Sequence, residues 1–197
     1  ITPTGSNLCI GGTSNFTSTV AGGTWISSNP AVATIDPNTG LLTAISNGSI
    51  TVTYTVLGTG VCLGTDATSN TAVVVAASPD AGTVSITDAT ICEGSTTTAS
   101  STQVGGLWSS SDLGVATVDA NTGLVTGIGA GTATLTYTVV GTGSCLGTDA
   151  TSTVGVSVTA APDAGTASIT DATICEGSTT TASSTQVGGL WSSSDLG

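Results

Sequence analysis

The chain has 197 residues, with no Lys, Arg or His against 12 Asp plus Glu, so its formal net charge is −12 at pH 7. Because cationic side chains are what neutralise phosphate groups, this composition excludes nucleic acids and anionic membrane surfaces as partners. The same lack removes the usual neutral-pH general base and the cationic clamp of a phosphate or oxyanion site, so we expect no enzyme and no catalytic residues.

The sequence repeats itself along its length. Residues 79–114 recur as residues 162–197 with one change, Val84 to Ala167, at a shift of 83 positions (162 − 79). The same shift superimposes the tryptophans, the tyrosines and the cysteines without a gap. We therefore expect a first repeat over residues 1–78, a second over residues 79–161, and the N-terminal part of a third over residues 162–197.

Short strands are expected throughout each repeat. Residues 49–56 of the first repeat alternate between apolar side chains and Ser or Thr, which is the pattern of a half-buried strand, and residues 132–139 repeat it in the second. Further short strands of the second repeat are predicted at residues 84–86, 96–100, 107–109, 115–118, 124–128 and 154–158. About seven strands in a unit of this size indicate an all-β fold, an antiparallel sandwich with Greek-key connections.

Turn and linker signals separate these strands. The Asp-x-Asn-Thr-Gly sequences at residues 36–40 and 119–123 suit turns in which Asp accepts bonds from backbone amides and Gly takes a positive φ. Short linkers at residues 78–82 and 161–165 should place the repeats end to end. Calcium is a weaker alternative for the aspartates, since the remaining ligands of a calcium loop are missing, and no other cofactor is expected. The calcium candidates would be Asp36, Asp80, Asp119 and Asp163.

One segment carries a family resemblance. Residues 105–139, GGLWSSSDLGVATVDANTGLVTGIGAGTATLTYTV, contain the motifs W-S-S, V-A-T-V-D, T-G-x-V-T-G and G-T-A-T-x-T-Y, and resemble the core signature of the group 2 bacterial immunoglobulin-like domain. The added cysteines are similar to those in repeats of very long surface proteins that gliding or biofilm-forming Gram-negative bacteria export. The resemblance implies tandem immunoglobulin-like β-sandwiches on an extracellular or cell-surface protein. It also implies core positions for Trp25, Trp108, Trp191, Tyr54 and Tyr137.

The cysteines are expected to form disulfides in an exported protein. The favoured pairing joins Cys9 to Cys62 and Cys92 to Cys145 within each repeat, with the partner of Cys175 outside the sequence. Two alternatives stay open. If Cys92 lies in the turn between the first two strands and Cys145 in the loop between the last two, an immunoglobulin topology places them at opposite poles. Stacked repeats would then bring Cys145 close to Cys9 of the preceding repeat. The second alternative is that the thiols are all free. Metal binding by the cysteines is not expected, because no CxxC motif and no His accompanies them.

The functional hypothesis follows from the repeats and the resemblance. It is a structural module of a bacterial extracellular fibre, stalk or surface filament, acting as a spacer and mechanical element. Its partners would be neighbouring repeats of the same chain and identical chains in a filament. The longest apolar run, residues 72–77, is far shorter than the roughly 20 residues of a membrane-spanning helix, so no membrane span is expected. The alternative is an adhesin module that binds glycans or another cell surface through its Thr-rich faces or its pole loops.

Overall fold

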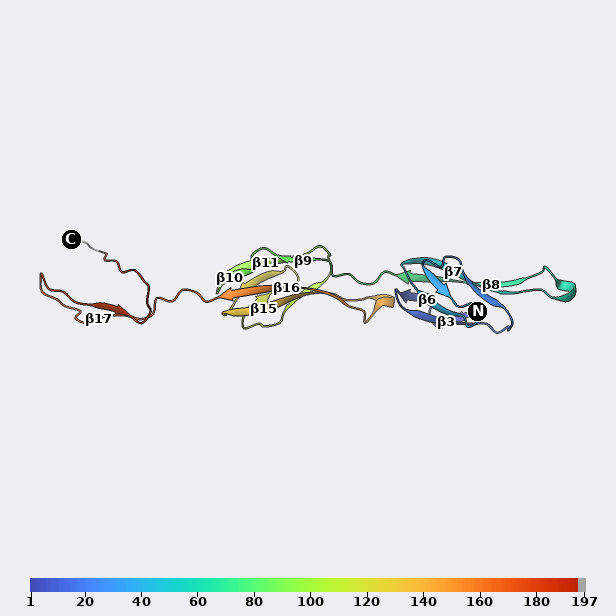
Figure 1. Cartoon of the computed structure of the whole chain (residues 1–197), viewed down its shortest axis with the longest axis horizontal. Coiled ribbons are helices and arrows are strands. Elements are labelled where there is room, and N and C mark those ends of the chain that lie inside the picture. The colour runs from blue at the N-terminus through green and yellow to red at the C-terminus, as the bar shows by residue number, and fades with distance from the viewer. Residues whose placement is uncertain (195–197) are drawn as a thin grey trace.

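The computed structural model describes residues 1–194, and the fold is all-β. Two closed sandwiches and a smaller two-stranded unit follow one another along a single long axis (Figure 1). Within the described residues, no helix is long and apolar enough to cross a membrane.

The first sandwich packs two four-stranded sheets against each other. One sheet has the order β1–β3–β6–β5 and the other β2–β8–β7–β4. Strand β2 runs parallel to β8, while the other neighbours are antiparallel. The strands are β1 (Thr2–Pro3), β2 (Asn7–Cys9), β3 (Thr13–Thr17), β4 (Thr24–Ser27), β5 (Ala33–Ile35), β6 (Leu41–Ala44), β7 (Gly48–Val56) and β8 (Ala67–Ala76).

The second sandwich has the same topology. Its sheets have the orders β13–β14–β11–β9 and β10–β16–β15–β12, and β10 runs parallel to β16. Its strands are β9 (Val84–Ile86), β10 (Thr90–Cys92), β11 (Thr96–Ser101), β12 (Leu107–Ser110), β13 (Ala116–Val118), β14 (Leu124–Gly127), β15 (Gly131–Val139) and β16 (Ala150–Thr159).

The strand pattern of the second repeat differs from the prediction in two places. Sequence reasoning missed β10, which is only three residues long, and the first half of β16. Strand β10 forms by pairing with the far end of β16, residues 157–159. A pairing between such distant segments leaves no local period in the sequence.

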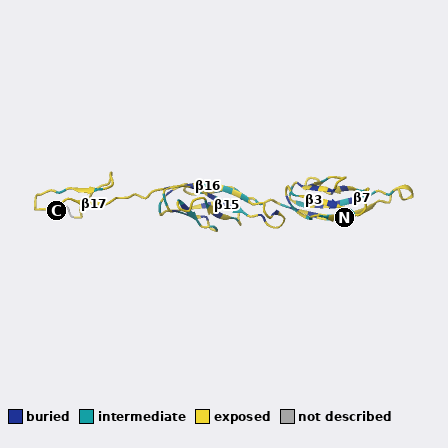
Figure 2. Ribbon diagram, turned by 90° about the horizontal axis from the view of Figure 1, so that it is seen from below, coloured by how far each residue is buried: buried dark blue, intermediate teal, exposed yellow. Residues whose placement is uncertain are grey.

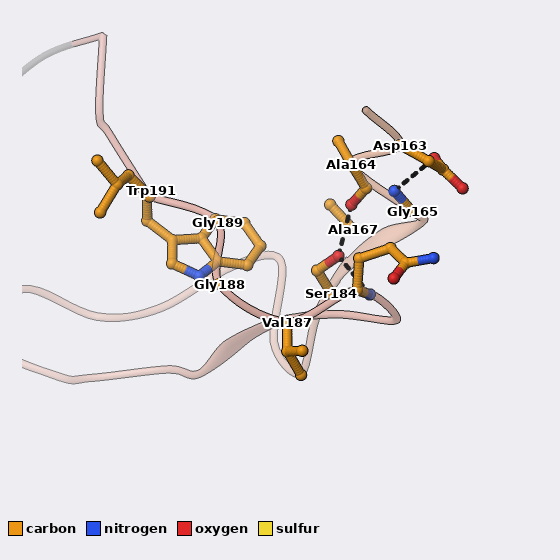
Figure 3. Close-up of a pocket in the computed structure, with 11 residues that line it drawn as sticks. Asp163, Ala164, Gly165, Ala167, Ser184, Val187, Gly188, Gly189 and Trp191 are labelled. Atoms are coloured by element: carbon orange, nitrogen blue, oxygen red, sulfur yellow. Dashed lines mark hydrogen bonds between the residues drawn. The ribbon is translucent and has the colours of Figure 1, made fainter. Parts of the chain in front are cut away.

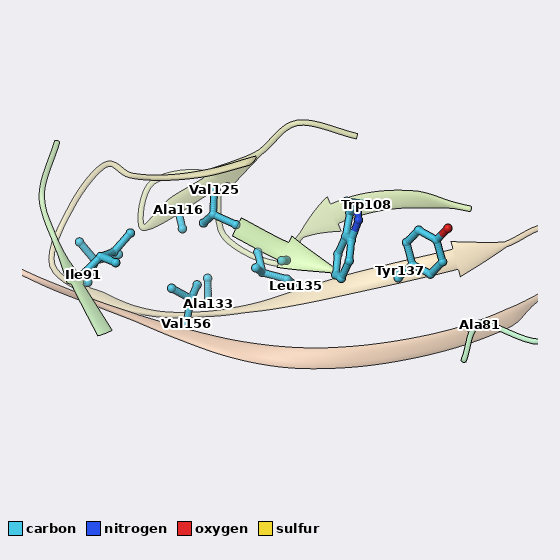
Figure 4. Packing of buried hydrophobic residues seen from close by; sticks show 11 residues of the cluster. Ala81, Ile91, Trp108, Ala116, Val125, Ala133, Leu135, Tyr137 and Val156 are labelled. Atoms are coloured by element: carbon cyan, nitrogen blue, oxygen red, sulfur yellow. The ribbon is translucent and has the colours of Figure 1, made fainter. Parts of the chain in front are cut away.

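Alternation along the long strands builds the core of each sandwich. In β15 the inward side chains Ala133, Leu135 and Tyr137 are buried, and Figure 4 shows them facing the opposite sheet. Trp108 is 6% exposed, and its ring centroid lies 5.0 Å from that of Tyr137. In the first sandwich Trp25 and Tyr54 form the same pair at 4.4 Å. The two cores are thus separate and equivalent.

The tyrosine hydroxyl is fully used inside each sandwich. Tyr137 donates a hydrogen bond to the carbonyl of Gln103 at 3.0 Å and accepts one from the Gly106 amide at 2.8 Å. Gly106 leaves room for this ring, because a Cβ there would lie 2.7 Å from Tyr137 Cζ. The polar end of a buried tyrosine needs such partners, and the loop before β12 supplies them.

The third unit is not a closed sandwich. Its strands β17 (Ala167–Ile169) and β18 (Ala182–Ser184) pair only with each other among the described residues. Trp191 is 59% exposed, whereas its counterparts Trp25 and Trp108 are buried. The reason is that Trp108 is covered by β15, and the sequence holds no counterpart of β15 for the third unit. Figure 2 shows the buried residues gathered in the first two units only.

Candidate functional site

Two long hairpins extend beyond their own sandwiches. Strands β7 and β8 pair from Gly48–Val75 to Val56–Ala67, and β15 and β16 pair in the same way. The loops that close them contain the short 3-10 helices η1 (Gly60–Cys62) and η2 (Gly143–Cys145). Figure 1 shows the second hairpin reaching the end of the first sandwich, while the first hairpin projects at the far end of the molecule.

A disulfide joins the second hairpin to the first sandwich. Cys145 in η2 is bonded to Cys9 at the end of β2, with a Cα–Cα distance of 4.9 Å and a sequence separation of 136. The two residues are only 2% and 7% exposed. Cys145 Sγ lies 3.3 Å from the carbonyl oxygen of Ala77, and Cys9 Sγ lies 3.7 Å from the Ser78 hydroxyl. The bond is therefore enclosed between two repeats and beside their linker, and we call this contact the joint.

The favoured pairing within repeats is wrong. Cys9 and Cys62 lie at opposite poles of the first sandwich, since Cys9 pairs with the C-terminal end of β8 and Cys62 lies in the loop before β8 begins. Strand β7 alone has 9 residues, which span about 30 Å, and a disulfide requires Cα atoms within about 7 Å. Cys92 and Cys145 are separated in the same way. Cys62, Cys92 and Cys175 are free and exposed.

The loop of the second hairpin is held in shape by its own residues. Asp149 Oδ1 accepts a hydrogen bond from the Gly141 amide at 3.0 Å, and the Thr148 hydroxyl donates to the Cys145 carbonyl at 2.6 Å. Gly143 takes a φ of +60°, which other residues rarely adopt. These contacts present Cys145 at the tip. A sequence signal for this shared loop was overlooked. The nine residues 58–66, GTGVCLGTD, and 141–149, GTGSCLGTD, are nearly identical, which indicates that both hairpins end in the same loop.

The four aspartates named as calcium candidates cap backbone turns. Asp36 Oδ1 accepts from the amide of Thr39 at 2.7 Å, and Asp119 Oδ1 from that of Thr122 at 2.8 Å. These backbone bonds are the main cause that lowers the pKa of both carboxyls.

The two linker aspartates act alike. Asp80 and Asp163 each accept a hydrogen bond at 2.8 Å, from the amides of Gly82 and Gly165. Across residues 1–194, no three Asp, Glu, Cys or His side chains gather closely enough to hold a metal ion.

A hollow of about 270 Å³ lies on the third unit. Figure 3 shows Trp191 on one side of it and Asp163, Gly165 and Ser184 on the other. In the second repeat the equivalent tryptophan is covered by the Tyr137 ring. The hollow is thus the inner face of the third unit that no second ring covers.

Comparisons with known proteins agree with this fold. Residues 10–60 match the family model of the bacterial Ig-like domain (group 2). A search of curated protein sequences gives no match.

Several solved structures are similar to this chain at low identity. Domains 1–6 of the surface layer protein SbsC are 23% identical, with 75% of this chain and 21% of that chain covered and a TM-score of 0.29. The C-terminal 282-residue fragment of intimin, in complex with the intimin-binding domain of the translocated intimin receptor, is 17% identical, with coverage of 80% and 62% and a TM-score of 0.42. Murine CEACAM1b is 11% identical, with coverage of 81% and 98% and a TM-score of 0.38. The chain spans only about a fifth of the SbsC structure, and the likeness concerns the fold alone.

Proposed function

Since residues 10–60 match the family model of the bacterial Ig-like domain (group 2), we propose that the chain is a spacer and mechanical element of a bacterial extracellular fibre, stalk or surface filament. The observation that carries this proposal is the buried Cys9–Cys145 disulfide across the joint. A disulfide of this kind persists in oxidising compartments, which supports a location outside the cell. The partner that the joint supports is the neighbouring repeat of the same chain.

The disulfide changes the route by which tension passes along the chain. A pull on the two chain ends reaches Cys9 and crosses directly to Cys145, so residues 10–144 lie outside the covalent path. That segment holds most of both sandwiches, including β7 and β15. Because the bypassed sandwiches carry little of the load, the length of the rod is set by the joint and by the strand that follows it.

The hidden length is large. At about 3.5 Å per extended residue, the sequence separation of 136 between the bonded cysteines corresponds to roughly 480 Å. An oxidised chain cannot release this length even when its sandwiches unfold. A spacer whose reach must stay constant under load requires this property.

Force spectroscopy on single molecules held by their ends tests the proposal. The oxidised chain should extend only through the residues outside the disulfide loop, and adding a reductant should release roughly a further 480 Å. Cys145→Ser should release that length without reductant. Cys62→Ser, which removes a free thiol, is the matched control and should behave like the parent chain. Equal extension of the parent chain with and without reductant would contradict the mechanical role.

A further inference from the structure

The free thiols of Cys62 and Cys92 occupy the positions of the bonded ones. Cys62 corresponds to Cys145 and Cys92 to Cys9 under the shift of 83 residues (145 − 62 and 92 − 9). We propose that the first hairpin loop and the Cys92 pole of the second sandwich are the two open halves of the joint, each built to bond another repeat of this kind. Cys92 would then pair with the loop cysteine of the repeat that follows it.

The open loop already has the conformation of the bonded loop. Asp66 accepts from the Gly58 amide at 3.1 Å, where Asp149 accepts at 3.0 Å in the bonded loop. The Thr65 hydroxyl donates to the Cys62 carbonyl at 2.6 Å, the same distance as its counterpart. The residue before η1, Thr59, has φ −124° and ψ 158°, against −120° and 159° before η2. Bonding therefore requires no rearrangement of this half.

The open pole is preformed as well. Strand β10 pairs with residues 157–159 in the register in which β2 pairs with residues 74–76. Beyond the cysteine, the Gly94 amide donates to the Gly127 carbonyl at 2.9 Å, matching the bond from Gly11 to Ala44 at 3.0 Å. The Ser95 amide donates back to the Cys92 carbonyl at 3.0 Å, as the residue three after Cys9 does at 2.9 Å.

The residue after the cysteine differs between the two poles, and the change leaves the cysteine accessible. Glu93 stands where the first repeat has Ile10. Its carboxylate accepts from the amides of Ala130 at 3.0 Å and Ala161 at 3.4 Å, so it tethers the start of the second linker. Cys92 remains exposed beside that linker, as Cys9 would be without the incoming hairpin.

The third unit has a cysteine, Cys175, at the position of Cys9 and Cys92, but within residues 1–194 it lacks the strand that contains them. Around Cys175 no strand forms among the described residues, because no counterpart of β16 is there to pair with. In the first two repeats the pole strand pairs with the last strand of its own sandwich. This predicts that Cys175 stays unpaired until the third sandwich is complete.

Joining the two halves is an oxidation. The two thiols become one disulfide, and their two electrons and two protons pass to a small-molecule disulfide such as oxidised glutathione, which leaves as two thiols. Successive loops would then overlap, since the loop that starts at Cys92 begins before the loop that ends at Cys145. An array built in this way would be covalently continuous along two routes, the backbone and the disulfides.

The test lengthens the chain with its own sequence. Adding a copy of residues 115–161 after Gly197 completes a third repeat and supplies one more loop cysteine, giving six cysteines in place of five (5 + 1). The extended chain is treated with oxidised glutathione, then denatured and alkylated without reductant. The intact mass of the chain gives the number of alkylated thiols, and it also shows any cysteine that carries glutathione as a mixed disulfide. Exposure of Trp191, read from its fluorescence, should fall as the third sandwich closes.

The count separates the possible pairings. In the monomeric mass we expect two thiols, those of Cys62 and Cys175, and three in the parent chain, while joints between chains would appear separately as dimeric and larger masses. Cys62→Ser should lower the count of the extended chain to one, and Cys92→Ser should raise it to three by freeing the added cysteine. A count of four would overturn the proposal because Cys92 would be unpaired, and a count of zero would overturn it in favour of pairing within repeats.

A second variant checks the new joint by itself. In the extended chain with Cys9→Ser and Cys145→Ser, Cys92 should still be protected from alkylation, and its modification would reject the inference. The mechanical purpose of these further joints rests on the proposed function. The thiol count nevertheless fails or succeeds independently of the force measurement, which uses only the parent chain.

Discussion

Two aspartates hold the turns between β5 and β6 and between β13 and β14. Asp119 Oδ1 accepts from the Asn121 amide at 3.1 Å and from the Thr122 amide and hydroxyl at 2.8 Å each, and Asp36 caps its turn through two backbone amides. Hydrogen bonds to the ionised carboxylate favour the charged form, which is why the pKa of both groups is lowered. Each aspartate therefore stabilises only its own turn.

This lowering predicts an acid-sensitive part of the stability. The pKa in the folded state lies below the ordinary 3.8, so the stabilisation is complete above that value and disappears as pH falls through the lowered pKa. Urea midpoints of the parent chain should therefore drop between pH 5 and pH 3 more than those of Asp36→Asn with Asp119→Asn. Asp88→Asn removes a carboxylate that accepts no hydrogen bond from the described residues and serves as the control. Parallel midpoint curves for the parent and the double variant would show that the caps contribute nothing.

At the level of single elements, the hairpin loop is the part that forms the joint. It is pre-organised by its own aspartate and threonine in both repeats, whether or not its cysteine is bonded. Pre-organisation raises the effective concentration of Cys145 at Cys9, because the tip already points along the hairpin. The bond therefore depends on the loop as well as on the two cysteines.

Loosening this loop should slow the formation of the disulfide. Asp149→Ala removes the bond to the Gly141 amide, at a cost of about 1 kcal/mol, which corresponds to roughly a fivefold loss in effective concentration. After reduction, the Cys9–Cys145 bond should reform about five times more slowly in a glutathione buffer, followed by alkylation and mass measurement. Asp66→Ala makes the same change in the open loop and should leave the rate unaltered. Equal slowing by both variants would point to a general loss of folding.

At the scale of the whole molecule, a chain without cations has few ways to fix one repeat on another. Ion pairs between side chains require Lys, Arg or His, and the sequence has none. A disulfide that closes a loop with a sequence separation of 136 restricts the unfolded chain by about 5 kcal/mol in the chain-entropy model. The joint thus stabilises the pair of repeats as a unit and keeps their linker short of full extension.

The Cys9–Cys145 disulfide should hold the chain together after its backbone is cleaved inside the disulfide loop. Ala77→Lys places a single trypsin site at the exposed residue before the linker, in a chain that otherwise has no Lys or Arg. After trypsin treatment, a denaturing gel without reductant should show the full-length mass, and a reduced gel should show fragments of 77 and 120 residues (197 − 77). Adding Cys145→Ser should release both fragments without reductant. A single Ala77→Lys chain that falls apart on the non-reduced gel would show that the disulfide is absent in solution.

The amino-acid sequence was enough to predict the all-β class, the resemblance to bacterial immunoglobulin-like domains and the tandem order of the repeats. Those features depend on residues close together in the sequence. The alternation of apolar and polar side chains in β15 and turn residues such as Asp119 act on their immediate neighbours. Only the tertiary structure decided how the cysteines pair. A disulfide depends on which poles meet, and Cys9 meets Cys145 because separate sandwiches stack end to end. The exposure of Trp191 was decided in the same way, by whether a distant strand arrives to cover the ring.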